Sequence, residues 1–339
     1  MVTQPLRGRW DPIPTMERNK MLRRWGLELL LFLFVPVCIS GILLFLNPTF
    51  LRQIAIALRF SFTIVFPLLV FLFFLAFSLP RKWGKAVAVV VIVSVYSLAL
   101  LGVWASGFSD TYILSGLLPI SDASGYYSNT LRFPLVGQFT EFASRRPLFN
   151  SLLTSISVLT NYNFVLIQSI LVLIMGIACT YAALAVRDSY GSLPAALVAV
   201  LLLFYFRRFI GFFSSETLGL GLGASGFVFL WRSAVLRSHK YFFPGIFLCS
   251  LGLITRAGAF LVLPMLVLWG AIFLGKRAKQ RIWVAASGII IIIAAFLMNT
   301  ALYQLYGAPE AASFSNYAYS LYGLATGGLG WKQVLIDHR

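Results

Sequence analysis

The sequence has little charge and few residues suited to a water-exposed surface. Only 11% of its 339 residues are Asp, Glu, Lys or Arg, whereas a soluble domain carries about 25%. Apolar residues make up 60% of the chain, and the mean hydropathy is +0.88. These values exclude an ordinary soluble domain. Because the apolar residues form continuous runs, and helices satisfy their own backbone hydrogen bonds in lipid, the sequence predicts an all-α polytopic protein of the lipid bilayer.

Histidine and cysteine are also scarce. The two histidines, His239 and His338, provide no material for a Ser-His-Asp triad or a histidine metal site. The three cysteines, Cys38, Cys179 and Cys249, lie within apolar runs and are poor candidates for a disulfide framework or a metal cluster. The absence of a Walker A motif argues against nucleotide hydrolysis. Carboxylates can hold a divalent metal such as Mg²⁺ or Mn²⁺, but their spacing here is not diagnostic, so the cofactor stays open.

Basic residues outnumber acidic ones by 27 to 10, a net charge of +17. In a membrane protein such a surplus collects in cytoplasmic loops, so no nucleic-acid partner is expected. Residues 1–25 form a basic cytoplasmic tail, and the apolar stretch after it is predicted to be a retained signal anchor. Nine membrane spans are predicted, at about 26–46, 59–79, 86–105, 164–186, 193–209, 217–231, 241–255, 258–274 and 282–304.

The stretch from Leu148 to Asn163 decides the orientation of everything after it. Its apolar residues share one helical face, which predicts a helix lying along the membrane interface; they are Leu148, Phe149, Leu152, Leu153, Ile156 and Leu159. If this helix does not span, seventeen basic residues are cytoplasmic and ten are not; if it spans, the division is fourteen to thirteen. The positive-inside rule therefore predicts a multi-pass protein of the cell membrane with a cytoplasmic N-terminus and a non-cytoplasmic C-terminus.

The predicted layout divides the chain into four parts. They are the tail 1–25, two N-terminal transmembrane helices in 26–85, a membrane core 86–304 with a long outer loop 106–163 carrying amphipathic interfacial helices, and a non-cytoplasmic segment 305–339. Within the core, the apolar run 241–275 would measure roughly 50 Å as one helix, against a hydrocarbon thickness of about 30 Å. A break is therefore expected at Thr255 to Gly258. No terminating element follows 305–339, so the chain can be a fragment of something longer.

Charged residues of the outer loop are the first candidates for function. The acids Asp110, Asp122 and Glu141 share this loop with the pair Arg145 and Arg146. Carboxylates and arginines beside a membrane indicate a site for an anionic lipid-linked ligand. A merely solvated loop is the alternative, above all for Asp110 and Glu141.

Two later charges are further candidates. Glu216 stands at the predicted start of a helix, where it is either functional or complements the helix dipole after Ser214 or Ser215 as N-cap. Arg256, alone in a long apolar run, is either a snorkelling surface arginine or a phosphate ligand with a planar fork of donors. The glycines at 219, 221, 223 and 226 are predicted to pack helices rather than to bind a nucleotide.

The C-terminal segment is rich in tyrosine and glycine. Aromatic rings there are either an interfacial belt or a platform for a sugar ring. The pair Gly327 and Gly328 allows a ligand to approach the backbone closely, and Lys332 could add a phosphate contact.

Short motifs on the predicted outer side resemble the C-type membrane glycosyltransferases, the superfamily of the dolichyl-phosphate-mannose protein mannosyltransferases. The resemblance covers roughly residues 86–339, behind two further helices. Its landmarks are Asp122 with Tyr126 and Tyr127, the Arg-Pro-Leu at 146–148, the Ser-Glu-Thr-Leu at 215–218 and the Thr-Arg-Ala at 255–257.

This resemblance implies roles for particular residues. Asp122 would be the catalytic base or a metal ligand, and Arg256 with Arg145 and Arg146 would hold the phosphate of a polyprenyl-phosphate-linked sugar donor. Glu216 would orient the acceptor, which can be a glycan, a lipid or a protein. The expected activity is sugar transfer on the non-cytoplasmic face by single displacement with inversion. A lipid or polysaccharide transporter or flippase and a non-catalytic membrane subunit are the alternatives.

Overall fold

The described part of the chain is almost entirely helical. The computed structural model describes residues 34–45, 49–256, 258–328 and 330–337. Within these ranges, five helices are long and apolar enough to cross a membrane. They are α4 (Arg81–Ser106), α8 (Phe164–Tyr190), α9 (Ser192–Phe206) with the 3-10 turn η1 (Arg207–Phe209), α10 (Ser215–Leu236) and α13 (Ala278–Tyr306). The chain is thus a helical, membrane-embedded protein.

Four of the nine predicted spans are not matched by such long helices. α3 (Val65–Ser78), α11 (His239–Thr255) and α12 (Val262–Leu274) have 14, 17 and 13 residues, and a 14-residue helix reaches only about 21 Å. The predicted span 26–46 lies largely outside the described residues. Its described part, Phe34–Phe45, could form one further span together with the helix that follows it, α2 (Thr49–Phe60). The prediction for 59–79 was wrong at its start, because Phe60 still belongs to α2.

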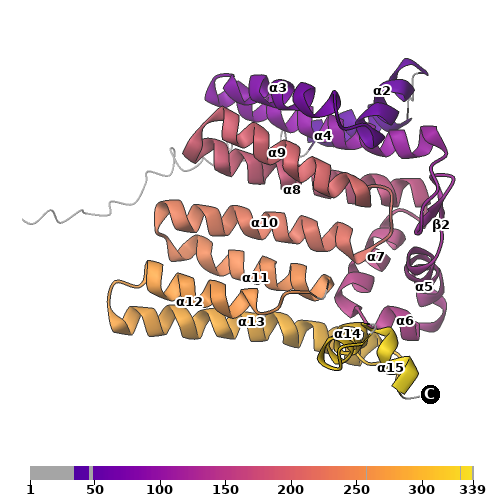
Figure 1. Cartoon of the computed structure of the whole chain (residues 1–339), viewed down its shortest axis with the longest axis vertical. Helices are drawn as coiled ribbons and strands as arrows, with labels where there is room; N and C mark the ends of the chain where they lie inside the picture. The colour runs from indigo at the N-terminus through magenta and orange to yellow at the C-terminus, as the bar shows by residue number, and fades with distance from the viewer. Residues whose placement is uncertain (1–33, 46–48, 257, 329, 338–339) are drawn as a thin grey trace, which may run out of the picture.

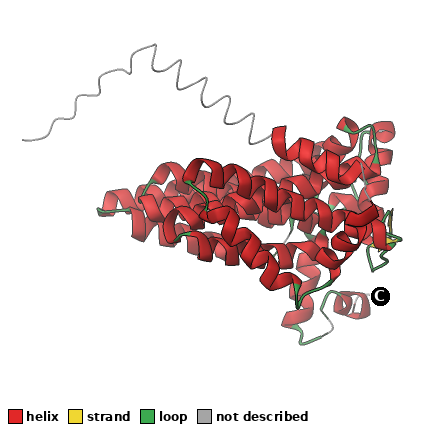
Figure 2. Cartoon of the chain, turned by 90° about the horizontal axis from the view of Figure 1, so that it is seen from above, coloured by secondary structure: helices red, strands yellow, loops and turns green. Residues whose placement is uncertain are grey.

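The long helices lie side by side in a row (Figures 1 and 2). Neighbours in the row are in contact, in the order α4, α8, α10, α11 and α13. At one end of the row lie the small elements, and we call this the polar end (Figure 1). They are the hairpin of β1 (Ile113–Leu114) and β2 (Leu118–Pro119), and the helices α5 (Asp122–Val136), α6 (Glu141–Ser144), α7 (Pro147–Leu159), α14 (Ser315–Ala325) and α15 (Lys332–Asp337).

The other end of the row, the loop end, contains short connections between long helices (Figure 1). The basic residues that the sequence assigned to the cytoplasm, apart from those of the tail 1–25, all belong to this end. They are Arg81, Lys82, Lys85, Arg187, Arg232, Arg237, Lys240, Lys276, Arg277, Lys279 and Arg281. The predicted long outer loop 106–163 and the segment 305–337 share the opposite, polar end.

Glycines allow α10 and α11 to approach closely. A Cβ atom on Gly226 would lie 2.6 Å from Cys249 Sγ and 2.9 Å from its backbone nitrogen. A Cβ on Gly252 would lie 2.9 Å from the carbonyl oxygen of Gly219 and 3.1 Å from the nitrogen of Gly223. These glycines therefore serve as a helix-packing surface, as predicted. The break after Thr255 is also confirmed, because α11 ends there.

The helix predicted at 148–163 is present as α7, and the residues of its apolar stripe divide between the protein interior and the surface. Its buried residues are Pro147, Leu148, Phe149, Asn150, Leu153, Thr154 and Ser157, whereas Leu152 and Leu159 are exposed. Asn150 can face inward because its amide nitrogen donates to the carbonyl oxygens of Ala143 and Arg146, at 2.8 and 3.0 Å. α7 contacts α5, α6, α8, α10, α11 and α13, and this set of neighbours could not be read from its apolar stripe.

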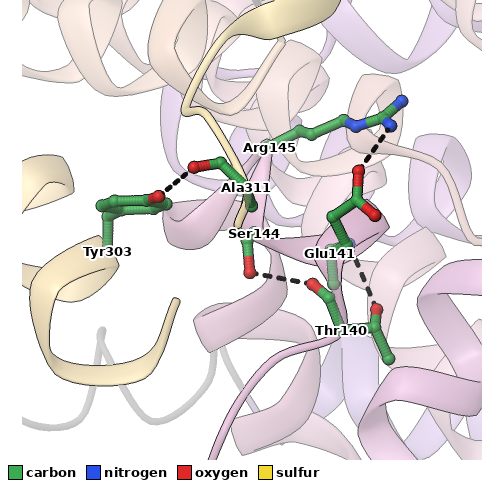
Figure 3. A network of polar contacts seen from close by, with 7 residues as sticks. Thr140, Glu141, Ser144, Arg145, Tyr303 and Ala311 are labelled. Carbon is green, nitrogen blue, oxygen red and sulfur yellow. Dashed lines mark hydrogen bonds and ion pairs between the residues drawn. The ribbon is translucent and has the colours of Figure 1, made fainter. Parts of the chain in front are cut away.

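The chain after α13 is fastened to α6 and to the residues before it. Phe139 N donates to Tyr306 O at 2.7 Å, and Ala308 N donates to Ser144 Oγ at 2.8 Å. Ser144 in turn donates to Thr140 O at 2.8 Å, while Tyr303 donates to Ala311 O (Figure 3). These bonds attach the C-terminal segment to the polar end.

Candidate functional site

Two arginines converge on a Ser-Glu pair at the polar end. Arg256 Nη2 lies 3.2 Å from Glu216 Oε1. Arg146 Nη1 donates to Ser215 Oγ, and this hydroxyl donates to Glu216 Oε2 at 3.2 Å. Ser215 is fully buried, whereas the Arg256 side chain is about half exposed at 48%. The four residues form one continuous polar network, which we call the Ser-Glu cluster.

Helix ends bring the Ser-Glu cluster together. Arg146 precedes Pro147, the first residue of α7, and Ser215 and Glu216 open α10. Arg256 directly follows the last residue of α11. A Cβ on Gly219 would lie 3.1 Å from Arg256 Cβ, so the absence of a side chain on α10 allows this approach. An acid at the N-terminus of α10 also complements the helix dipole.

The sequence predicted Ser214 or Ser215 as the N-cap of α10 with Glu216 in the first turn, and this prediction is only partly confirmed. Ser214 is the N-cap residue of α10, but its side chain makes no capping hydrogen bond. The Ser214 hydroxyl is buried and has no hydrogen-bond partner among the described residues. The Ser215 hydroxyl links Arg146 to Glu216 instead of capping the helix. This bridging role was not predicted from the sequence, where the adjacent Ser215 and Glu216 are its signal.

Tyr126 is buried beside the Ser-Glu cluster. The Arg146 guanidinium lies 5.9 Å from the centroid of its ring. Burial raises the pKa of Tyr126 to about 12, although Arg146 and Arg256 act to lower it. Asp122 and Glu216 act to raise this pKa further. All four charges are therefore close enough to act on one hydroxyl group.

Asp122 lies one helical turn before Tyr126, in the first turn of α5. Residues four apart share a helix face, and the charge of Asp122 acts on Tyr126. Its side chain is exposed and makes no hydrogen bond or ion pair with any other described residue. Asp122 is thus an exposed carboxylate whose charge, like those of Arg146 and Arg256, acts on Tyr126.

The raised pKa of Tyr126 predicts a loss of stability at alkaline pH. A tyrosine with an unfolded pKa of 10.0 and a folded pKa of about 12 contributes stability that is fully present below pH 10 and is lost as the pH rises towards 12. At pH 11 we expect the stability of the wild type to fall by about 1.4 kcal/mol more than that of Tyr126→Phe. Thermal unfolding of the two detergent-solubilised proteins at pH 8.5 and 11 measures the difference. Equal alkaline losses would contradict the prediction.

Three other predicted site residues lie outside the Ser-Glu cluster. Arg145 pairs with Glu141 at 3.4 Å (Figure 3), whereas Arg146 donates to Ser215. Tyr127 donates to Tyr162 O at 3.2 Å and packs against Phe164 and Phe213. The exposed Lys332 lies in α15, beside Trp331. The structure therefore separates the arginine pair into one member within the cluster and one outside it.

Neither metal binding nor family membership receives further support. Among the described residues, no group of three or more His, Cys, Asp or Glu side chains comes together, and the divalent cation left open by the sequence stays a prediction. No protein-family model, curated protein or solved structure matches this chain. Its function is therefore inferred from the polar end itself.

Proposed function

We propose that the protein is a membrane glycosyltransferase that transfers a sugar from a polyprenyl-phosphate carrier to an acceptor on the non-cytoplasmic face. The observation that carries this proposal is the convergence of Arg146 and Arg256 on Ser215 and Glu216. The charge of Asp122 acts on Tyr126 together with those of the cluster. Arginine offers a planar fork of donors that matches phosphate oxygens. A carboxylate near such a phosphate site is suited to accept a proton.

The transfer is a single displacement. The acceptor hydroxyl attacks the anomeric carbon while its proton passes to a carboxylate oxygen of Asp122. The bond between the anomeric carbon and the phosphate oxygen breaks, and its electron pair leaves with the polyprenyl phosphate. Arg146 and Arg256 stabilise the negative charge of that leaving group. One displacement inverts the anomeric centre.

Glu216 controls the availability of Arg256 in this scheme. Its carboxylate holds the guanidinium in place before the carrier binds, at 3.2 Å. The phosphodiester of the carrier has one negative charge, as Glu216 has, and it can share the same arginine, whose five N–H donors exceed what Glu216 uses. Glu216 is then free to orient the acceptor hydroxyl.

We also propose nine membrane spans with the N-terminal tail in the cytoplasm and the C-terminus outside. The basic residues of the loop end support this orientation, because such residues collect on the cytoplasmic side. In this arrangement the polar end, with Asp122 and the Ser-Glu cluster, faces the non-cytoplasmic side. The short helices α3, α11 and α12 would cross a locally thinned bilayer or leave their ends in its interfacial region.

Carrier binding tests the role given to the arginines. We expect Arg256→Gln and Arg146→Gln each to weaken the binding of a polyprenyl-phosphate hexose by about tenfold or more, because a charge-assisted hydrogen bond contributes roughly 1.5–3 kcal/mol. Arg145→Gln is the matched control and should bind like the wild type, since Arg145 faces Glu141. Native mass spectrometry of the purified protein measures the three affinities. Equal losses in all three variants, or no loss in any, would contradict the proposal.

A further inference from the structure

Three arginines form a second cationic group at the polar end, away from the Ser-Glu cluster. Arg59 is near the end of α2, and Arg207 and Arg208 form η1 with Phe209. Arg59 Nη2 donates to Arg208 O at 3.3 Å. Arg207 Nη1 donates to the carbonyl oxygens of Leu58 and Ser61, at 3.1 and 2.7 Å. These bonds join α2 to η1, and we call the three residues the arginine cluster.

Capping of α2 explains only part of the arginine cluster. Cations near a helix C-terminus interact favourably with its carbonyl groups, which accounts for the position of Arg207. Arg59, however, is only 6% exposed and its Nε atom is buried without a hydrogen-bond partner among the described residues. Arg208 is exposed, and its side chain makes no hydrogen bond with another residue in the part of the chain that the structure describes. Capping of α2 therefore accounts for Arg207 but not for the positive charges of Arg59 and Arg208.

The charge of the arginine cluster is poorly compensated by the described residues. The positive charge of Arg207 disfavours the charged form of Arg59, whereas the negative charge of Asp110 favours it. Asp110 Oδ1 already accepts bonds from the backbone nitrogen and the hydroxyl of Thr111, at 2.7 and 3.3 Å. No described carboxylate lies within ion-pair distance of any of the three arginines. Burying a cation is costly unless an anion accompanies it.

Aromatic rings lie beneath each guanidinium. Arg59 lies 5.4 Å from the ring centroid of Phe60 and 5.6 Å from that of Phe108. Arg207 lies 4.1 Å from the Phe204 centroid. Arg208 lies 5.1 Å from the Phe209 centroid. Such contacts stabilise the cations and leave their remaining N–H donors available to an anion.

The surroundings of the arginine cluster identify the kind of anion. Phe60, Phe62, Ile64 and Tyr205 adjoin the cluster in sequence and are 40%, 57%, 71% and 56% exposed. Phe62 also contacts Phe204, at a centroid distance of 5.0 Å. A free phosphate ion would leave these apolar side chains uncovered, whereas acyl chains would cover them.

We propose that the arginine cluster binds the phosphate headgroup of an anionic phospholipid, whose acyl chains cover the exposed residues at the end of α2 and the start of α3. This site uses none of the residues assigned to sugar transfer. The headgroup phosphate supplies the missing negative charge to Arg59, Arg207 and Arg208, and so fastens α2 to η1. The lipid is a structural ligand in this account, and no bond is made or broken.

Lipid retention tests this proposal. The full-length protein is purified in detergent, exposed to equal amounts of dioleoyl phosphatidylglycerol and dioleoyl phosphatidylcholine, and analysed by native mass spectrometry. We expect the wild type to retain phosphatidylglycerol in preference to phosphatidylcholine by about tenfold. Phosphatidylglycerol has a net negative charge, whereas the choline of phosphatidylcholine neutralises its phosphate. The double variant Arg207→Gln with Arg208→Gln should lose this preference. Arg208→Gln alone, at an exposed position, should weaken it without affecting folding.

Arg132→Gln is the matched control, because Arg132 is an exposed arginine of α5 outside the arginine cluster. It should retain the wild-type preference. Equal retention of both lipids by the wild type, or an undiminished preference in the double variant, would overturn the proposal. Displacement of bound phosphatidylglycerol by inorganic phosphate alone would overturn the assignment to a lipid and leave a simple phosphate site.

Discussion

Replacing Asp122 by asparagine is expected to lower the rate of sugar transfer by about 10²- to 10⁴-fold, the range that a positioned general base contributes. Asparagine keeps the size of the side chain but cannot accept the proton of the acceptor hydroxyl. Asp122 is exposed and unpaired among the described residues, so the folded protein should be as stable as the wild type. Initial rates at saturating carrier, together with carrier affinity, measure the effect.

Glu141→Gln is the control for this substitution. Glu141 is an exposed carboxylate at the same end of the molecule, and its partner is Arg145. We expect its transfer rate to equal that of the wild type. A rate for Asp122→Asn within a factor of about three of the wild type, well below what a general base contributes, would remove Asp122 from the mechanism. A parallel loss of carrier binding would assign it to binding instead.

Replacing Gly252 by alanine is expected to separate α10 from α11 and to destabilise the fold by about 1–3 kcal/mol, as overpacking of a tight contact does. The new Cβ would lie 2.9 Å from the carbonyl oxygen of Gly219, which belongs to a helix backbone and cannot rotate away. Gly219 adjoins Arg256, because a Cβ on Gly219 would lie 3.1 Å from Arg256 Cβ. We therefore expect the Arg256 to Glu216 pair to loosen. Thermal unfolding and carrier binding measure the two effects.

Gly223→Ala provides the matched control on α10. A Cβ at Gly223 would meet no atom within 4 Å, and alanine favours a helix over glycine by about 1 kcal/mol. This variant should be as stable as the wild type or more so. If Gly223→Ala and Gly252→Ala had the same stability and the same carrier affinity, close packing of the glycines would not be what holds α10 against α11.

The sequence predicted best those features that depend on hydropathy and local length. The break after Thr255 followed from the length of an apolar run and the bilayer thickness, and α11 ends at that residue. Gly219 and Gly226 of α10 were correctly interpreted as packing residues, whereas a Cβ on Gly223 would meet no atom within 4 Å. The start of α3 was predicted wrongly, because the apolar residues of α2 and α3 form nearly one run while the chain turns at Ser61 to Ile64.

Features set by tertiary contacts were harder to predict. The apolar stripe of α7 predicted an interfacial helix but not its neighbours, which are six helices. Asn150, Thr154 and Ser157 are buried, whereas Leu159 is exposed. Arg145 and Arg146 looked equivalent in sequence, but the turn into α7 directs Arg146 toward Ser215 and Arg145 toward Glu141. Adjacent residues outside a helix can point in different directions, and only the neighbouring elements decide between them.

The central claim is sugar transfer, and the most direct measurement follows a labelled sugar on the wild-type protein in lipid vesicles. The vesicles contain polyprenyl-phosphate hexoses or pentoses and a membrane extract as the source of acceptors. We predict that one polyprenyl phosphate is released for each sugar transferred, with inversion at the anomeric carbon. Binding of the carrier without any transfer, or movement of the intact carrier across the bilayer, would contradict the account and indicate an accessory subunit or a transporter.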